Sequence, residues 1–180
     1  MAVREILVGV TGGIAAYKTA SLVSRLMQSG DSVTVVMTEA ATRLVGPKTF
    51  EALTGRPVGV DIWAPTPHPH IDLARRAELL CVAPATANFL AKAAWGLADD
   101  LLTTCLLAFT GPVVVAPAMN AQMWAKPAVQ RNLQRLRDDG FVIIEPGEGH
   151  LSCGEIGTGR MAEPDVIFAK IEEVLNRRIV

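Results

Sequence analysis

Residues 6–19 read ILVGVTGGIAAYKT and combine an apolar run, a glycine pair and the beginning of a helical pattern. The run is apolar throughout and does not alternate with polar residues, which is typical of a strand buried on both faces. Four more runs rich in β-branched or other apolar residues follow, so that the five predicted strands are 6–10, 33–37, 79–83, 113–116 and 141–144. Together they predict a sheet that is covered on both sides.

Helical patterns lie between these runs. They span residues 15–28, 89–109 and 121–137, and a last helical pattern follows Pro164 over residues 165–177. The segment 58–63 can add a short strand to the sheet. Strands that alternate with helices form parallel sheets. The sequence therefore predicts an α/β fold with a single domain over residues 1–180, a Rossmann-like doubly wound parallel sheet in a flavodoxin-like three-layer sandwich.

The composition excludes several classes of protein. Of the 180 residues, 50% are hydrophobic and 19% are charged, which is too apolar for a disordered chain. The 17 basic and 18 acidic residues nearly cancel and form no basic run, which disfavours nucleic-acid binding. The uncharged segment 101–125 is interrupted by Gly111-Pro112 and Pro117, short of the ~20 residues of a membrane helix. With no signal-peptide pattern at the N-terminus, we expect a cytoplasmic protein.

The glycine pair after the first strand fits neither of two familiar phosphate-binding motifs. A GxGxxG fingerprint that starts at Gly9 needs glycine where Thr11 and Ile14 stand, and a P-loop that starts at Gly12 needs glycine at Tyr17. A strand-to-helix turn with free N–H groups can still hold a mononucleotide phosphate. A tight turn that binds nothing is the equally open alternative.

Polar side chains also follow the second and third predicted strands. Thr38 can add a hydroxyl to the same phosphate, although a plain helix N-cap is the simpler interpretation. In the loop 84–88, small residues let a flat ring approach the backbone, while Thr86 and Asn88 offer polar groups to its edge. The alternative for this loop is a capped helix start.

Two more polar residues stand at predicted helix starts. His70 precedes a short helical pattern, where the helix dipole disfavours imidazolium and leaves a neutral base. An idle surface histidine is the alternative, and that interpretation suits His68, between two prolines, better. Asn120 opens the helix after Pro117, so local sequence alone favours an N-cap role.

The three cysteines are far apart and form no CxxC pair, which suggests neither a disulfide framework nor a metal site. Cys81 and Cys105 lie in apolar segments, where a cysteine is a small inert hydrophobe. Cys153 lies in the Gly-rich polar segment 147–160, where a nearby cation favours the thiolate. Loops of this kind commonly form a lid over a site.

Four segments, taken together, resemble the family of homo-oligomeric flavin-containing cysteine decarboxylases. They are 9–18 (GVTGGIAAYK), 70–73 (HIDL), 117–120 (PAMN) with Met123-Trp124, and Cys153-Gly154 within 149–161. The four occur in the family's order over nearly the whole chain. That order is far more specific than any single segment, and it raises His70, Asn120 and Cys153 above their simpler interpretations.

The resemblance implies a set of site residues. FMN would have its phosphate near Gly12, Gly13, Ile14 and Thr38, and its ring near Thr86, Ala87 and Asn88. His70, Asn120 and Cys153 would be catalytic, and Ala118, Met119 and Asn120 would contact substrate. In this scheme His70 acts as a base or orients a carboxylate, Asn120 holds the carboxylate, and Cys153 donates a proton.

The implied activity is FMN-dependent decarboxylation of phosphopantothenoylcysteine to phosphopantetheine in coenzyme A biosynthesis. The thiol is oxidised to a thioaldehyde, CO2 leaves, and the enethiolate is reduced again. The resemblance also implies homo-trimers or homo-dodecamers with active sites between subunits, and a synthetase domain that is fused to this one in many bacteria. We expect neither a membrane nor a nucleic-acid partner.

Three alternatives stay open at this point. Peptidyl-cysteine oxidative decarboxylases stop at the enethiol and lack the reducing cysteine, so Cys153 argues against that activity. Some relatives are non-catalytic FMN-binding regulatory subunits, which typically lose the histidine or the cysteine, whereas this chain has His70 and Cys153. Flavin prenyltransferases share the fold, but we do not expect them to carry the PAMN segment.

Overall fold

The computed structural model describes residues 3–63, 68–150, 154 and 156–177. The main sheet has the strands β1 (Glu5–Val10), β2 (Ser32–Met37), β3 (Leu79–Ala85), β4 (Val113–Pro117) and β5 (Val142–Ile143). They are all parallel and lie in the order β2-β1-β3-β4-β5. The predicted doubly wound parallel sheet is confirmed.

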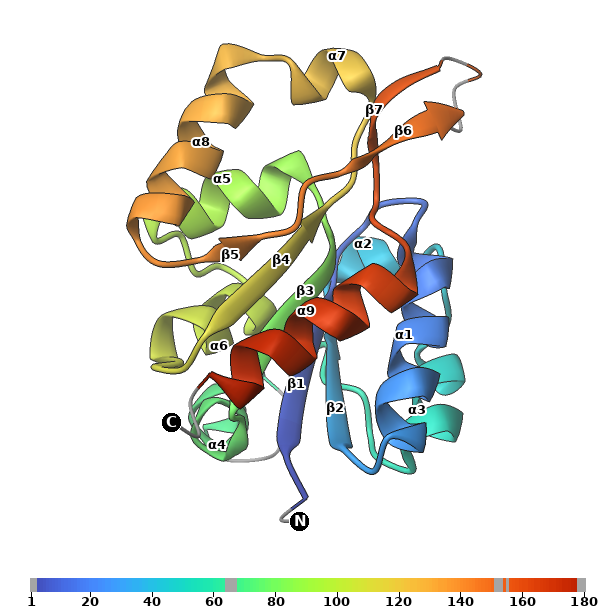
Figure 1. Ribbon diagram of the computed structural model, residues 1–180. Helices are drawn as coiled ribbons and strands as arrows, with labels where there is room; N and C mark the ends of the chain where they lie inside the picture. The colour runs from blue at the N-terminus through green and yellow to red at the C-terminus, as the bar shows by residue number, and fades with distance from the viewer. Residues whose placement is uncertain (1–2, 64–67, 151–153, 155, 178–180) are drawn as a thin grey trace.

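Helices cover both faces of this sheet (Figure 1). One face carries α1 (Ala16–Gln28), α3 (Pro47–Thr54) and α9 (Pro164–Asn176), and the other carries α4 (Pro69–Arg76), α5 (Ala87–Trp95), α6 (Leu101–Ala108) and α8 (Pro127–Asp138). Two one-turn helices, α2 (Glu39–Thr42) and α7 (Ala121–Trp124), follow β2 and β4.

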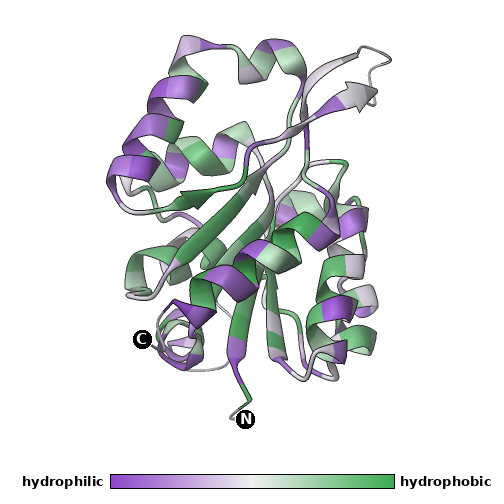
Figure 2. Cartoon of the chain, in the orientation of Figure 1, coloured by the Kyte–Doolittle hydropathy of each residue, from purple (hydrophilic) through white to green (hydrophobic). Residues whose placement is uncertain are grey.

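Successive residues of a strand point to opposite faces, so each central strand contributes to two cores. Ile6 and Val8 pack with α1 and α9, whereas Leu7 packs in the cluster that includes α5 and α6. All three side chains are at most 1% exposed. Figure 2 shows the result: apolar strands lie between helices that turn their polar residues outward.

Three predicted elements differ from the structure. The helical pattern 89–109 forms two helices, because Gly96 adopts a left-handed φ of 66° at the end of α5 and Asp100 caps α6. The pattern 121–137 is divided before Pro127, which opens α8. The segment 58–63 adds only one isolated bridge, between Gly59 and Val36.

The Gly-rich segment that the sequence suggested as a loop contains a hairpin. Strands β6 (Gly147–His150) and β7 (Ile156–Arg160) pair antiparallel beside α7, at the upper end of the molecule in Figure 1. Residues 151–153 and 155, which include Cys153, lie outside the described part.

The strand order also predicts where a ligand binds. In open α/β sheets, ligands bind beyond the carboxyl ends of the strands, at the point where the order of strands reverses. Here that point lies between β1 and β3, which pair directly. The loops that begin at Thr11 and Thr86 flank it.

Candidate functional site

Two pockets meet at this switch point. We call them the central pocket, of about 550 Å³, and the side pocket, of about 500 Å³. Gly12, Thr86, Ala87 and Met123 line both. The two pockets therefore form one continuous hollow over the ends of β1 and β3.

The turn after β1 forms the floor of both pockets. A Cβ atom on Gly12 would lie 2.5 Å from the Cβ of Ala40, so only glycine lets the loops after β1 and β2 approach this closely. Among the described residues, no side chain caps α1, whose N-cap position is Ala15. A turn that leads into an uncapped helix N-terminus is suited to an anion.

Thr38 and Thr86 each cap the helix that follows them. The Oγ1 of Thr38 accepts a hydrogen bond from the Ala41 N–H at 3.3 Å, and the Oγ1 of Thr86 accepts one from the Phe89 N–H at 3.3 Å. The N-cap interpretation is thus confirmed for both residues. Both also line the side pocket, together with Asn88.

Thr11 is a site residue that the sequence analysis did not select. Its buried hydroxyl donates to the Pro84 carbonyl at 2.7 Å and accepts from the Thr86 N–H at 3.1 Å. These two bonds hold the loop after β3 against the turn after β1. A threonine at a strand end beside a glycine pair was the available signal.

The segment after β4 forms the opposite wall of the central pocket, where Ala118, Met119 and Asn120 lie. The Oδ1 of Asn120 accepts from the N–H groups of Gln122, at 2.8 Å, and Met123, at 3.3 Å. Asn120 is therefore the N-cap of α7, as predicted.

The hairpin of β6 and β7 contributes Gly159 and Arg160 to the central pocket. The sequence predicted this segment as a loop that forms a lid over a site. The Met119 N–H donates to the Gly159 carbonyl at 2.9 Å. A Cβ on Gly159 would lie 2.2 Å from the Met119 carbonyl oxygen. Gly159 therefore allows β7 to lie directly on the segment before α7.

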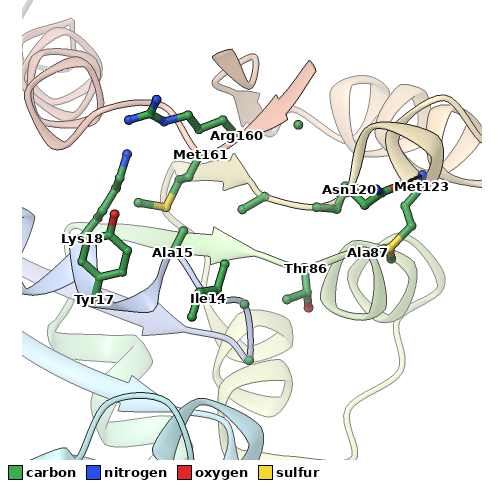
Figure 3. A pocket seen from close by; sticks show the side chains of 15 residues that line it. Ile14, Ala15, Tyr17, Lys18, Thr86, Ala87, Asn120, Met123, Arg160 and Met161 are labelled. Atoms are coloured by element: carbon green, nitrogen blue, oxygen red, sulfur yellow. Dashed lines mark hydrogen bonds between the residues drawn. The ribbon is translucent and has the colours of Figure 1, made fainter. Parts of the chain in front are cut away.

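Two cations line one end of the central pocket (Figure 3). Lys18 and Arg160 contact Glu163 at 2.8 Å and 3.0 Å. The hydrogen bond from Lys18 and the charge of Lys18, followed by the charge of Arg160, lower the pKa of Glu163. Figure 3 shows Asn120 and Met123 at the other end of the same pocket. From the sequence, Lys18 was notable only as part of a motif.

The side pocket also contains an ion pair that was not predicted. Lys92 contacts Asp99 at 2.6 Å and Asp100 at 3.6 Å, and the bond to Asp99 raises the pKa of Lys92. Asp100 caps α6 through the Thr103 N–H at 2.8 Å. An aspartate before an apolar run was the sequence signal for this cap.

His70 does not line either pocket. It lies on α4, which Figure 1 places near the chain termini and away from α7 and the hairpin. Its ring is half-buried, and that of His68 lies 6.4 Å away at 90°. One chain therefore brings together the predicted residues of the turn, the loop 84–88 and the segment 118–120, but not His70.

The prediction that Cys81 and Cys105 lie in the apolar interior is confirmed. Cys81 and Cys105 are buried, and burial raises the pKa of each thiol to about 12. Within the described residues, no group of three His, Cys, Asp or Glu side chains could hold a metal ion. None of the helices in that part of the chain is long and apolar enough to span a membrane.

Comparisons with known proteins agree with this geometry. A family model described as Flavoprotein matches residues 1–176. The chain is 50% identical over 173 residues to the coenzyme A biosynthesis bifunctional protein CoaBC of Bacillus subtilis. The matched region covers 94% of this chain and 43% of that protein. The chain thus spans less than half the length of this curated relative.

Solved structures match over the whole domain. The FMN-dependent cysteine decarboxylase SpaF superimposes with a TM-score of 0.85 and 38% identity, covering 99% of this chain and 98% of that one. A PPC decarboxylase mutant in complex with pantothenoylaminoethenethiol superimposes with a TM-score of 0.86 and 32% identity. The superposition covers 96% of this chain and 98% of that one.

Proposed function

The chain belongs to the flavoprotein family, and from this premise we propose that it is an FMN-dependent phosphopantothenoylcysteine decarboxylase domain. It acts in coenzyme A biosynthesis and produces phosphopantetheine. The observation that carries the proposal is the continuous hollow at the switch point, which joins an anion-binding turn, a loop of small residues and the Asn120 segment.

The residues of this hollow fit FMN. Gly12 permits a cradle that a Cβ atom would fill, and the Thr38 hydroxyl lies in the same wall. No side chain in the described part of the protein caps the start of α1. Ala87 leaves room for a flat ring, and Thr86 and Asn88 can contact its polar edge. FMN bound there supplies an acceptor for the hydride of the substrate and a donor that returns it.

The polar side chains of the pocket then act on the substrate. A carboxylate β to a C=S group can leave as CO2, whereas the same carboxylate beside an unoxidised thiol cannot. Asn120, whose Oδ1 is fixed by the start of α7, orients that carboxylate. Cys153 donates the proton that completes the reduction of the enethiolate. Lys18 and Arg160 give one end of the pocket a net positive charge, which suits a substrate that carries a phosphate.

His70 completes the site from a neighbouring subunit. Within one chain, His70 is remote from Asn120 and does not line the pocket. Three large apolar side chains at the pocket rim are also exposed, with exposed fractions of 59% for Ile14, 61% for Tyr17 and 47% for Met123. Large apolar side chains around a pocket mark a surface that a partner covers. These observations support a homo-oligomer, a trimer or a multiple of three, in which His70 and Asn120 of different subunits meet.

The relatives named bifunctional also support a fused second domain, the phosphopantothenoylcysteine synthetase. In that arrangement this chain is the decarboxylase half and the product of the synthetase is its substrate. A peptide with a C-terminal cysteine is the second candidate substrate, because SpaF, at 38% identity, is named a cysteine decarboxylase.

Mass spectrometry of the reaction product tests the proposal. Phosphopantothenoylcysteine incubated with the FMN-loaded protein should lose CO2 alone. Loss of CO2 together with two hydrogens would indicate the oxidative activity that ends at an enethiol. No change in this substrate, with turnover of a peptide that ends in cysteine, would contradict the proposed substrate, and no turnover of either would favour a regulatory subunit.

A further inference from the structure

His70 has one ring nitrogen that the protein encloses. It is the second residue of α4, after Pro69 at the first helical position. Its Nδ1 atom is buried, and no group in the described part of the chain donates to it or accepts from it. Nε2 makes no hydrogen bond there either, but it is not enclosed in this way. Only Nε2 can therefore meet a ligand.

The position of Nδ1 decides where the proton of the neutral ring lies. A buried N–H without an acceptor loses the hydrogen bond that it makes with water. The first N–H groups of a helix point toward its N-terminus and create a positive potential there. This potential favours a lone pair over an N–H at Nδ1. Both effects oppose a proton on Nδ1, so the neutral ring carries its proton on Nε2.

We propose that His70 acts as a hydrogen-bond donor through Nε2–H, and not as the base that removes a proton from the substrate. The lone pair that a base needs is on Nδ1, where no ligand can reach it. This inference rests on the proposed function and chooses between the two roles that the sequence left open for His70. The group that receives the hydrogen bond is the carboxylate of the cysteine-derived substrate.

The proposal gives His70 and Asn120 the same kind of task. In the proposed function Asn120 contacts the substrate carboxylate, and its amide plane is fixed because its Oδ1 accepts from the N–H groups at the start of α7. His70 presents an N–H from α4. Two contacts from rigid helix starts can fix the plane of a carboxylate, and so the orientation of the bond that breaks to release CO2. No proton is transferred at His70 in this arrangement.

The tautomer can be measured without turnover. The FMN-loaded protein is labelled with ¹⁵N-histidine, which gives signals from three residues, and His68→Asn and His150→Asn variants assign them. Two-bond ¹⁵N–¹H correlations distinguish the protonated ring nitrogen from the one with a lone pair. We expect the lone pair at Nδ1 of His70. A proton on Nδ1, or a ring that has turned to expose Nδ1, would overturn the proposal.

Two substitutions test the role. In His70→Gln, the amide nitrogen reaches the place of Nε2, and the side chain cannot act as a base. In His70→Asn, the shorter amide reaches only the place of Nδ1. A donor role predicts that the Gln variant keeps turnover within about tenfold of the unmodified protein, while the Asn variant loses at least about a hundredfold.

A base role predicts a comparable loss, by about 10²-fold or more, in both variants. That result, with flavin retained and melting temperature unchanged in both, would refute the donor role. Substrate affinity gives an independent measurement: the Gln variant should bind phosphopantothenoylcysteine more tightly than the Asn variant. If the unmodified protein fails to turn over this substrate, the proposed function fails, whereas the tautomer measurement still decides the state of His70.

Discussion

The two walls of the central pocket are held in place in different ways. The turn after β1 and the loop after β3 extend from neighbouring strands, and the buried Thr11 hydroxyl joins them by two hydrogen bonds. The opposite wall consists of the segment before α7 and the hairpin, which lies on that segment through the contact of Gly159 with Met119. The first wall is part of the sheet, and the second is attached to it.

This difference has consequences for the two ligands. A cofactor site built on strand ends keeps its shape without the hairpin, because the sheet and its two cores do not depend on β6 and β7. The substrate end needs the hairpin, which carries Gly159 and Arg160 into the pocket. Changes in the hairpin should therefore affect turnover more than flavin binding, and changes in the turn should do the reverse.

Gly159→Ala should have the largest effect. Its φ of 143° is unfavourable for any residue with a Cβ, and that Cβ would meet a backbone oxygen at 2.2 Å. Since neither atom can move alone, β7 must separate from Met119. We expect turnover to fall by about a hundredfold or more, with flavin affinity nearly unchanged.

Gly149→Ala is the matched control for this variant. Gly149 lies in the same hairpin with a φ of 152°, but of the described residues its Cβ would meet only the flexible Arg160 side chain, at 3.4 Å. It therefore carries the backbone strain without the backbone clash. Loss of flavin from the Gly159 variant, measured by absorbance after gel filtration, would contradict the independence of the two walls.

Gly12→Ala should act on the other wall. The added Cβ meets the Cβ of Ala40 at 2.5 Å and its carbonyl carbon at 3.2 Å, so α2 has to move away from the turn. Overpacking of this kind costs about 1–3 kcal/mol. We expect the FMN dissociation constant, measured by fluorescence titration, to rise by about 10- to 100-fold.

Gly46→Ala is the control for the turn. A Cβ at Gly46 meets nothing within 4 Å, and its φ of −67° suits any residue. Its flavin affinity should equal that of the unmodified protein. An unchanged dissociation constant in the Gly12 variant would show that the close approach of the first two loops does not shape the cofactor site.

Most of the fold could be predicted because its signals are local. The buried strands 6–10, 33–37, 79–83 and 113–116 are continuous apolar runs, and the confirmed family resemblance rests on segments of at most ten residues. The divided helices were missed because the pattern 89–109 stays apolar on both sides of Gly96. There a left-handed glycine and the cap at Asp100 decide the boundary.

The site residues could be predicted only where the local sequence places them directly after a strand. Thr38, Thr86 and Asn120 follow strands, and parallel strands bring their carboxyl ends to one edge. Lys18 and Arg160 could not be paired from the sequence, because Glu163, which contacts both, is 145 residues away from Lys18 along the chain. The meeting of His70 with Asn120 depends on a second subunit and stays a prediction.

The smallest expected effect concerns Glu163, which joins the two walls. Its carboxylate contacts Lys18 on α1 and Arg160 at the end of β7, and its side chain is 54% exposed. Exposed ion pairs stabilise proteins by about 0–1 kcal/mol, so Glu163→Gln should lower the free energy of unfolding by a few tenths of a kcal/mol near neutral pH.

Because the fold lowers the pKa of the Glu163 carboxyl, its contribution to stability is fully present above the ordinary glutamate pKa of about 4.3. The contribution is lost as the pH falls through the lowered pKa. The difference between the two proteins, measured by urea unfolding, should therefore shrink steadily below about pH 4. A difference that grew with acidity would mean that Glu163 is protonated more easily in the folded protein, and that its contacts with Lys18 and Arg160 do not hold the hairpin to α1.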